Sequence, residues 1–320
     1  MERRTIAVCA RGRLLGAANL MFSPAASNRT PGARSDRLSE DPVLYGIKFV
    51  ASYLLGTDIA GRNLKVFPDD TFIASYPRSG NTWTRFLIAN LMHPEQPVTF
   101  ANIETIIPDA TSLSSRELKR VPRPRLIKTH EYFEPRYRKV IYLVRDPRDV
   151  VLSLYNFRRK YRSVDDSYPI EQYVAERFLP GDLDVSWGEH VGSWLGTRMN
   201  HPGFLLVRYE DLLQEPTREL QRLASFLDIA ADSGTLTQAI ERSSANRLRQ
   251  LEKVEHEAWV TTKGKRADVP FIAEAVTGTW KQKLPEPSVA LIESTWGHLM
   301  NPLGYETSAP RSSNARALMA

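Results

Sequence analysis

The 320-residue sequence contains a single cysteine, Cys9, close to its amino terminus. One cysteine allows no intramolecular disulfide and excludes a metal site built on several cysteines. Such low cysteine usage is typical of a reducing compartment, so we expect a cytoplasmic protein. No run of about 18 consecutive apolar residues is present, the length at which a transmembrane helix is expected. The sequence therefore predicts a protein with no disulfide and no membrane span.

The sequence also lacks the triphosphate-binding signature G-x-x-x-x-G-K-[ST]. A related arrangement is nevertheless present, because the apolar run Phe72 to Ala74 precedes a polar loop, Arg78 to Thr82, and a segment with helical periodicity. The backbone N–H groups of such a loop and the positive end of the following helix can surround an anion. The alternative is an ordinary strand-to-helix turn with a helix cap. The local sequence leaves both interpretations open.

Composition and charge do not point to one partner. Hydrophobic residues make up 42% and charged residues 25% of the chain, and the formal net charge is +6. These values fit an ordinary globular protein with an anionic ligand, although a nucleic acid or a membrane surface would suit the charge equally well. The basic residues are scattered and aromatic residues do not interleave with them, which disfavours a nucleic-acid partner.

Both ends of the chain are predicted to be disordered. Residues 1–43 are rich in Arg, Ser and Ala, and Arg11 and Arg13 interrupt an apolar run that a signal peptide would need. Residues 307–320 have a similar small and polar composition. We therefore expect one domain over residues 44–306.

Within that domain, short apolar runs alternate with segments of helical periodicity. Strands are expected at 71–75, 125–129, 139–144 and 204–209, and helices at 82–92, from Pro147, at 185–199, from Pro216 and at 288–300. This alternation predicts an α/β fold with three layers, in which helices flank a central parallel sheet. Ligands bind such sheets at the carboxyl ends of the strands. Polar residues follow all four expected strands, at 78–82, 128–130, 145 and 209–211.

Two of these segments contain pairs of residues with a chemical interpretation. Arg145 and Ser153 lie eight residues apart and could hold a phosphate, although Arg145 could instead pair with Asp146 or Asp149. Lys128 and His130 lie two residues apart, so in an extended strand both side chains point to the same side.

A base and a cation that face one cavity suit transfer to a hydroxyl group, whereas a lone histidine is more often structural. His190, on the tryptophan-rich helix expected at 185–199, is predicted to lie at the rim of the site. Tyr209 could stack on a base or cap the next helix.

Together these segments resemble the soluble sulfotransferases that use 3′-phosphoadenosine-5′-phosphosulfate (PAPS). "YPRSGNTW" is similar to the family's 5′-phosphosulfate loop, usually YPKSGTTW, and "LVRDPRDVVLSLYNF" is similar to its 3′-phosphate motif. "IKTH" resembles the segment with the catalytic histidine, "SWGEHVGSW" a helix near the acceptor pocket, and "VRYEDLLQEPTRELQRLASFLDI" the tyrosine–acid segment. The matches occur in family order over residues 66–306.

The resemblance implies a P-loop NTPase-like fold, PAPS as co-substrate, no metal, and transfer of a sulfuryl group to a hydroxyl or amine. His130 would be the general base, Lys128 would stabilise the sulfuryl oxygens, and Arg78 would lie at the bridging oxygen. Thr82 and the backbone amides of the loop would hold the 5′-phosphate, Arg145 and Ser153 the 3′-phosphate, and an aromatic pair the adenine. The cofactor-binding residues implied are Arg78, Ser79, Gly80, Asn81, Thr82, Trp83, Arg145, Ser153 and Tyr209.

The sequence departs from the family pattern in three places. The loop lysine is Arg78, which keeps the charge but changes its geometry. The family's Arg-Lys-Gly before Gly-x-Trp is replaced by Ala273-Glu274-Ala275, and "TTKGKR", with Lys263, Lys265 and Arg266, is a candidate replacement for this clamp. The family's dimer motif is absent, so no dimer is inferred.

Two other functions remain open at this stage. One is a nucleotide-dependent kinase that uses the same loop, with Asp211 as a magnesium ligand, and the other is a non-catalytic sulfotransferase-like binding protein. The acceptor is expected to be a small molecule, glycan or lipid-like compound with a hydroxyl group. Its pocket walls are predicted from 99–116, 131–137, 155–190 and 255–270, which include Glu131, Phe133, Tyr155, Phe157, Trp187 and Trp259.

Overall fold

The computed structural model describes residues 55, 59–183, 185–259, 261–273 and 275–308. The expected leader at 1–43 and most of the expected tail at 307–320 lie outside the described residues, as does Glu274 of the altered clamp. None of the described helices is long and apolar enough to cross a membrane.

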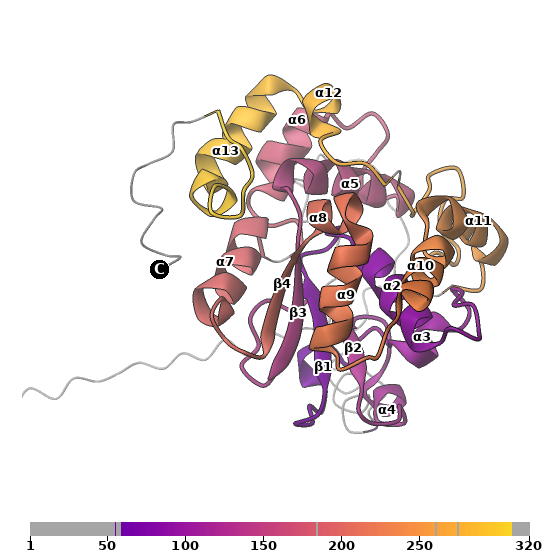
Figure 1. Cartoon of the computed structure of the whole chain (residues 1–320). Helices are drawn as coiled ribbons and strands as arrows, with labels where there is room; N and C mark the ends of the chain where they lie inside the picture. Colours follow the sequence, from indigo (N-terminus) through magenta and orange to yellow (C-terminus); the bar gives the residue numbers. More distant parts are fainter. Residues whose placement is uncertain (1–54, 56–58, 184, 260, 274, 309–320) are drawn as a thin grey trace, which may run out of the picture.

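The centre of the fold is a parallel sheet of four strands in the order β2-β1-β3-β4 (Figure 1). The strands are β1 (Thr71–Ser75), β2 (Leu126–Thr129), β3 (Lys139–Val144) and β4 (Phe204–Arg208). Each agrees with its expected range to within one residue. The register pairs Ile73 of β1 with Lys128 of β2 and Ile141 of β3, so the carboxyl ends of these strands meet at one edge.

Helices cover both faces of the sheet, as the three-layer prediction requires. Phe72 and Tyr142 face one core, which includes residues of α5 (Pro147–Lys160), α7 (Trp187–Arg198) and α13 (Glu286–Met300). Ile73 and Ile141 face the other core, with α2 (Asn81–Met92), α9 (Pro216–Phe226) and α10 (Ser233–Arg242). Because neighbouring residues of a strand point to opposite faces, a buried strand in such a sheet is apolar along its whole length.

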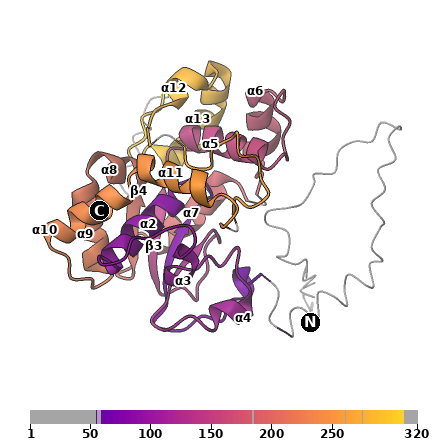
Figure 2. The same ribbon diagram turned by 90° about the vertical axis from the view of Figure 1, so that its right-hand side faces the viewer.

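Shorter elements and one more helix complete the described part. They are a 3-10 turn (Gly61–Asn63), α3 (Ile103–Ile106), α4 (Ser115–Leu118), α6 (Ile170–Tyr173), a π turn (Val174–Phe178), α8 (Tyr209–Gln214), α11 (Ala245–Glu255) and α12 (Trp280–Lys283). Figure 2 shows α11 between α5 and α2. Ala245 and Leu248 of α11 line the same cavity as residues of α2 and α5.

The start of α5 confirms the signal read from the sequence. Asp146 is the N-cap, and its side chain accepts a hydrogen bond from the backbone N–H of Arg148. Pro147 occupies the first helical position, where its missing N–H costs nothing. Arg145 therefore lies between the end of β3 and a helix whose first turn is fixed.

Candidate active site

A cavity of about 430 Å³ lies at the carboxyl edge of the sheet. Its lining comes from the segments that follow all four strands, as expected for a sheet of this kind. The candidate residues that line it are Arg78, Gly80, Asn81, Thr82, Trp83, Lys128, His130, Arg145, Ser153 and Tyr209. Ser79 is the one predicted site residue that does not line the cavity, and its side chain is buried.

The loop after β1 needs a glycine at position 80 for two reasons. Gly80 has φ of 95°, a left-handed conformation that side chains disfavour. A Cβ atom at this position would lie 2.4 Å from Cδ2 of Tyr209. The ring of Tyr209 in turn packs edge-on against Trp83, with 5.7 Å between the ring centroids. Gly80, Tyr209 and Trp83 thus pack closely together where they line the cavity.

The first turn of α2 presents backbone N–H groups rather than capping side chains. Gly80 is its N-cap and no side chain caps the helix. The first N–H groups of an α-helix have no partner within the helix, so they are available to a ligand. The side-chain amide of Asn81 donates to the carbonyl of Ile73 and to the hydroxyl of Ser75, so it ties the loop to β1. Of the two hydroxyl-bearing residues in the loop, Ser79 and Thr82, only Thr82 lines the cavity.

Two arginines meet in the cavity without a carboxylate partner among the described residues. Arg78 donates from Nε to Ser153 Oγ at 3.1 Å and from Nη2 to the carbonyl of Phe271 at 2.9 Å. Arg145 donates to the carbonyl of Arg78 at 3.3 Å and lies over the ring of Tyr209, while its buried Nε has no partner. Loss of water and the charge of Arg145 lower the pKa of Arg78 to about 10.

The alternative pairing of Arg145 with Asp146 or Asp149 is not what the structure shows. Asp146 forms an ion pair with Arg148 at 2.6 Å. Asp149 accepts hydrogen bonds from the backbone N–H of Gly278 and Trp280 and from the hydroxyl of Thr279. Asp149 therefore anchors the Gly-x-Trp segment, and Arg145 is left facing the cavity.

His130 has one defined tautomer. Its Nδ1 lies 2.8 Å from the backbone carbonyl of Ser75, which can only accept, so Nδ1 carries the proton. The other ring nitrogen, Nε2, is then the basic one. Loss of water and the nearby charge of Lys128 hold the pKa of His130 well below its ordinary value. The ring is therefore neutral near pH 7 and able to take up a proton.

Helix α7 holds the segments that follow β2 and β3 by hydrogen bonds to their backbone. Ring N–H groups on one face of the helix donate to backbone carbonyls that follow β2 and β3: Trp187 to Arg145 (3.2 Å), His190 to His130 (3.1 Å) and Trp194 to Glu131 (3.1 Å). The second nitrogen of His190 accepts from the hydroxyl of Tyr142. His190 lines the cavity, as a residue beside the site would, but it is fully buried and does not lie at an exposed rim. The tryptophans of this helix therefore support the backbone of the segments that follow β2 and β3.

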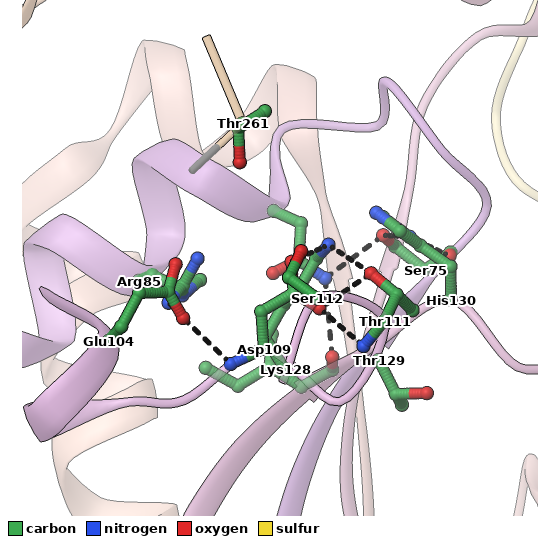
Figure 3. A network of polar contacts seen from close by, with 12 residues as sticks. Ser75, Arg85, Glu104, Asp109, Thr111, Ser112, Lys128, Thr129, His130 and Thr261 are labelled. Atoms are coloured by element: carbon green, nitrogen blue, oxygen red, sulfur yellow. Dashed lines mark hydrogen bonds and ion pairs between the residues drawn. The ribbon is translucent and has the colours of Figure 1, made fainter. Parts of the chain in front are cut away.

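Sequence reasoning missed one buried partner of Lys128, the expected catalytic lysine. Nζ of Lys128 lies 2.6 Å from Oδ2 of Asp109 and 3.3 Å from the hydroxyl of Thr111 (Figure 3). The residues around Asp109 belong to the range 99–116 that was predicted as a pocket wall. Nothing in the local sequence marks Asp109 as a partner of a residue 19 positions away.

The candidate clamp residues separate into two groups. Lys263 and Lys265 line the cavity, whereas Arg266 forms exposed ion pairs with Asp166 and Asp268. The predicted walls are also divided, because Glu131, Phe157 and Trp259 line the cavity but Phe133, Tyr155 and Trp187 do not.

Glu252 of α11 fixes the wall opposite the loop. Its carboxylate accepts from the backbone N–H groups of Phe271 and Ile272 and pairs with buried Lys160. The carbonyl of Phe271 is the one that receives Arg78. Among the described residues, no group of three or more His, Cys, Asp or Glu side chains could hold a metal ion.

Comparison with known proteins identifies the domain. Residues 68–304 match the family model described as the sulfotransferase domain. Mouse sulfotransferase 1B1 is 30% identical over 231 residues, which cover 67% of this chain and 77% of that protein. Bovine sulfotransferase 1A1 is 26% identical over 258 residues, 74% of this chain and 85% of that protein.

Solved structures share the fold. Mouse sulfotransferase SULT7A1, solved with PAP, superposes with a TM-score of 0.62 at 23% identity and covers 80% of this chain and 90% of its own. Retinol dehydratase, solved with retinol and PAP, has a TM-score of 0.62 at 22% identity and covers 81% of this chain and 88% of its own. The P-loop-like α/β architecture expected from the sequence is thereby confirmed.

Proposed function

The chain belongs to the sulfotransferase family, and from this premise we propose that it transfers the sulfuryl group of PAPS to a hydroxyl or amine of an acceptor, with His130 as general base. The observation that carries the proposal is the pair Arg78 and Arg145. Both guanidinium groups face the cavity with no carboxylate partner among the described residues. Buried charge needs a counter-charge, and an anionic ligand would supply it. By contrast, Arg125 and Arg158 each pair with a carboxylate.

The residues present fit a nucleotide that carries phosphate at two positions. Nε of Arg145 and Nε1 of Trp83, two residues that line the cavity, are buried polar atoms without a partner in the described part of the chain. Buried polar atoms are normally hydrogen-bonded, so unsatisfied ones grouped around a cavity indicate a ligand. The uncapped start of α2 adds backbone donors at the same place. We assign the 5′-phosphate to residues 79–82 and the 3′-phosphate to Arg145 and Ser153.

When bound, PAPS supplies a sulfuryl group on an anhydride bond to its 5′-phosphate. Nε2 of His130 removes the proton from the acceptor as the new oxygen–sulfur bond forms, or nitrogen–sulfur bond for an amine. Lys128 offers an N–H to the sulfuryl oxygens, and Arg78 stabilises the charge that develops at the bridging oxygen as its bond to sulfur breaks. The products are the sulfated acceptor, PAP and a proton held by His130. Such a reaction depends mainly on positioning and charge stabilisation.

The adenine site is proposed beside Trp83 and Tyr209, whose rings meet edge-on at 73° next to Gly80, so that the base would lie against this pair. Lys263 and Lys265 are the proposed substitutes for the family's Arg-Lys-Gly, since both line the cavity. Arg266 is not included, because its ion pairs turn it to the surface. A second cavity of about 840 Å³ shares Arg78, Arg145 and Ser153 with the first and adds Lys283. It offers room beside the proposed 3′-phosphate site.

The acceptor is proposed to be a small molecule with a largely apolar body. Ile59, Tyr76, Leu183 and Val185 line the cavity together with the buried carboxylate of Glu131. Retinol dehydratase, a protein of the same fold, was solved with retinol and with androsterone. The cytoplasmic location and the domain limits 44–306 remain predictions.

No observation favours the kinase alternative. Asp211, its candidate magnesium ligand, pairs with Arg208 at 3.2 Å and does not line the cavity. The distinguishing experiment is the thermal shift of the full chain with PAP, ATP and AMP, each with and without Mg²⁺. A ligand at about a hundred times its Kd adds about 2.7 kcal/mol to the free energy of unfolding.

The expected outcome is a shift with PAP that does not need Mg²⁺ and exceeds the shift with AMP. A shift with ATP alone, dependent on Mg²⁺, would replace the proposal by the kinase. No shift with any nucleotide would favour a non-catalytic relative, and the altered segment at 273–275 would be its first explanation.

A further inference from the structure

We propose that Asp109 is a positioning residue for the transfer reaction: its carboxylate orients the Lys128 ammonium toward the cavity and keeps it charged there. The inference rests on the function proposed above. It assigns a role to a residue that no motif of the sequence singles out. Three observations carry it: the contacts of the ammonium, the construction of the loop and the charges nearby.

The contacts of Lys128 leave one donor for a substrate. An ammonium group has three N–H donors. One points to Oδ2 of Asp109 at 2.6 Å and another to the hydroxyl of Thr111 at 3.3 Å. No third protein partner is present in the described part of the chain, and the side chain lines the cavity. The remaining N–H therefore has a direction set by the other two.

The loop that carries Asp109 is built around this contact. Residues 108–110 run parallel to β2, with the N–H of Lys128 bonded to the carbonyl of Pro108 and the N–H of Ala110 bonded to the carbonyl of Lys128. Oδ1 of Asp109 accepts from the backbone N–H (2.8 Å) and the hydroxyl (2.6 Å) of Thr111. Figure 3 shows Asp109, Thr111 and Ser112 gathered around the end of Lys128.

All four acceptor positions of the Asp109 carboxylate are thus in use, because Oδ2 receives Ser112 as well as Lys128. The carboxylate cannot turn away from the lysine without losing hydrogen bonds within the protein. A side chain that is fixed so completely is suited to hold its partner in one orientation. This is the arrangement that transfer by positioning requires.

The charges around Lys128 show why it needs a carboxylate. Arg85 of α2 and Glu104 of α3 lie on one side, paired with each other at 3.1 Å, and His130 lies two residues further along the chain. Burial and Arg85 lower the pKa of Lys128, whereas Asp109 raises it. Lys128 also lowers the pKa of His130, and Asp109 opposes that effect.

Removal of the Asp109 charge should therefore move the pKa of Lys128 further down. An opposite charge at this distance typically changes a pKa by roughly one to three units. The test is NMR titration of the full chain with labelled lysine Nζ in the presence of PAP, with Lys128→Arg to assign the signal. In Asp109→Asn, the Lys128 signal should titrate at lower pH than in the wild type. An unchanged titration would overturn the proposal.

Turnover gives a second readout that a purely structural role would not change. With PAPS and 2-naphthol as probes, kcat should fall at high pH as Lys128 loses its proton. In Asp109→Asn this alkaline limb of the pH profile of kcat should move to lower pH. Above that limb, the rate should fall about tenfold for each unit by which the pKa is lowered. An alkaline limb that stays in place in Asp109→Asn would contradict the proposal, because it would show that Asp109 does not keep Lys128 charged.

Two matched variants complete the design. Thr111→Val removes the second contact of Lys128 but keeps the carboxylate, so kcat should fall while the alkaline limb stays in place. Asp70→Asn removes the carboxylate of another buried ion pair, the one with Arg125 at the amino end of the sheet. It should lower the free energy of unfolding without moving the alkaline limb of the kcat profile. A shifted limb in Asp70→Asn would overturn the assignment to Asp109.

Asp109→Glu covers the case in which Asp109→Asn does not fold. It keeps the charge but displaces it, so the alkaline limb should stay while kcat falls. An unchanged kcat in Asp109→Glu would show that orientation is not the role of this residue. The NMR titration needs no turnover, so it judges the proposal on Asp109 even if no acceptor is sulfated. If the wild-type protein neither binds PAP nor sulfates an acceptor, the proposed function is refuted. That outcome is distinct from a failure of the proposal on Asp109.

Discussion

Replacement of Gly80 by alanine tests the geometry of the proposed phosphate-binding loop most directly. An alanine at position 80 would have to adopt φ of 95°. Its Cβ would lie 2.4 Å from the ring of Tyr209, so close that the ring or the loop backbone must shift. A left-handed conformation costs a residue other than glycine about 1–2 kcal/mol. Overpacking of a buried contact costs about 1–3 kcal/mol more. Gly80→Ala should therefore lower the free energy of unfolding by about 2–5 kcal/mol.

Gly264→Ala is the matched control. Gly264 also has a left-handed φ, of 67°, but a Cβ there would meet nothing within 4 Å. Its substitution should cost only the conformational part, about 1–2 kcal/mol. Both variants would be compared by urea unfolding of the full chain, with PAP binding as a second measurement. Gly80→Ala should lose PAP affinity because Tyr209 is displaced from Trp83.

The contact with Tyr209 can be isolated by a double-mutant cycle. In a Tyr209→Ala background the overpacking term disappears, so Gly80→Ala should then cost about as much as Gly264→Ala. Equal destabilisation by the two glycine variants in the wild-type background would refute the reasoning, because it would show that the ring yields without cost.

Three further predictions concern the catalytic and supporting residues. His130→Ala should abolish sulfuryl transfer while PAP still raises the melting temperature; near-normal turnover would remove His130 from its role as base. Arg145→Ala should weaken PAP about 10- to 100-fold, since a hydrogen bond to a charged group is worth about 1.5–3 kcal/mol, and should change AMP affinity little; equal losses measured by calorimetry would contradict the 3′-phosphate assignment. Burial lowers the pKa of His190 from its ordinary 6.5 to about 4, so the unfolded chain binds more protons between these values. Stability from this group is complete above pH 6.5 and is lost as the pH falls toward 4, by about 3 kcal/mol in all. His190→Gln should reduce that loss in urea unfolding measured at pH 7, 6, 5 and 4, and an unchanged slope would exclude His190 as its source.

The sequence by itself determined the layers of the fold and the edge at which the site lies. Runs such as Phe72 to Ala74 are apolar along their whole length because both faces of the strand are buried. Asp146 and Pro147 mark a helix start through contacts within one turn. Such signals are local, so they can be read without knowledge of the rest of the chain. The order of polar segments after apolar runs then placed ten of the eleven candidate residues on one cavity.

Only the tertiary structure decided which of these residues face the cavity and what holds them. Ser79 and Asn81 belong to the loop by sequence, yet one side chain is buried and the other is bonded to β1. Arg78 is held by Ser153 and by the carbonyl of Phe271, which is 193 residues away in the chain. Contacts of this kind depend on how distant segments close on one another, and no local pattern encodes them.

The same reason explains the two functional features that the sequence did not reveal. His190 was expected at the rim of the site from its place on the tryptophan-rich helix, whereas its bonds to Tyr142 of β3 and to the carbonyl of His130 make it a buried support. Asp109 lies in a loop without a recognisable motif, and only its pairing with β2 brings it to Lys128. The sequence determined which side chains are available for catalysis. The tertiary structure determined their tautomer, their charge and their direction, because each of these is set by a partner far away in the chain.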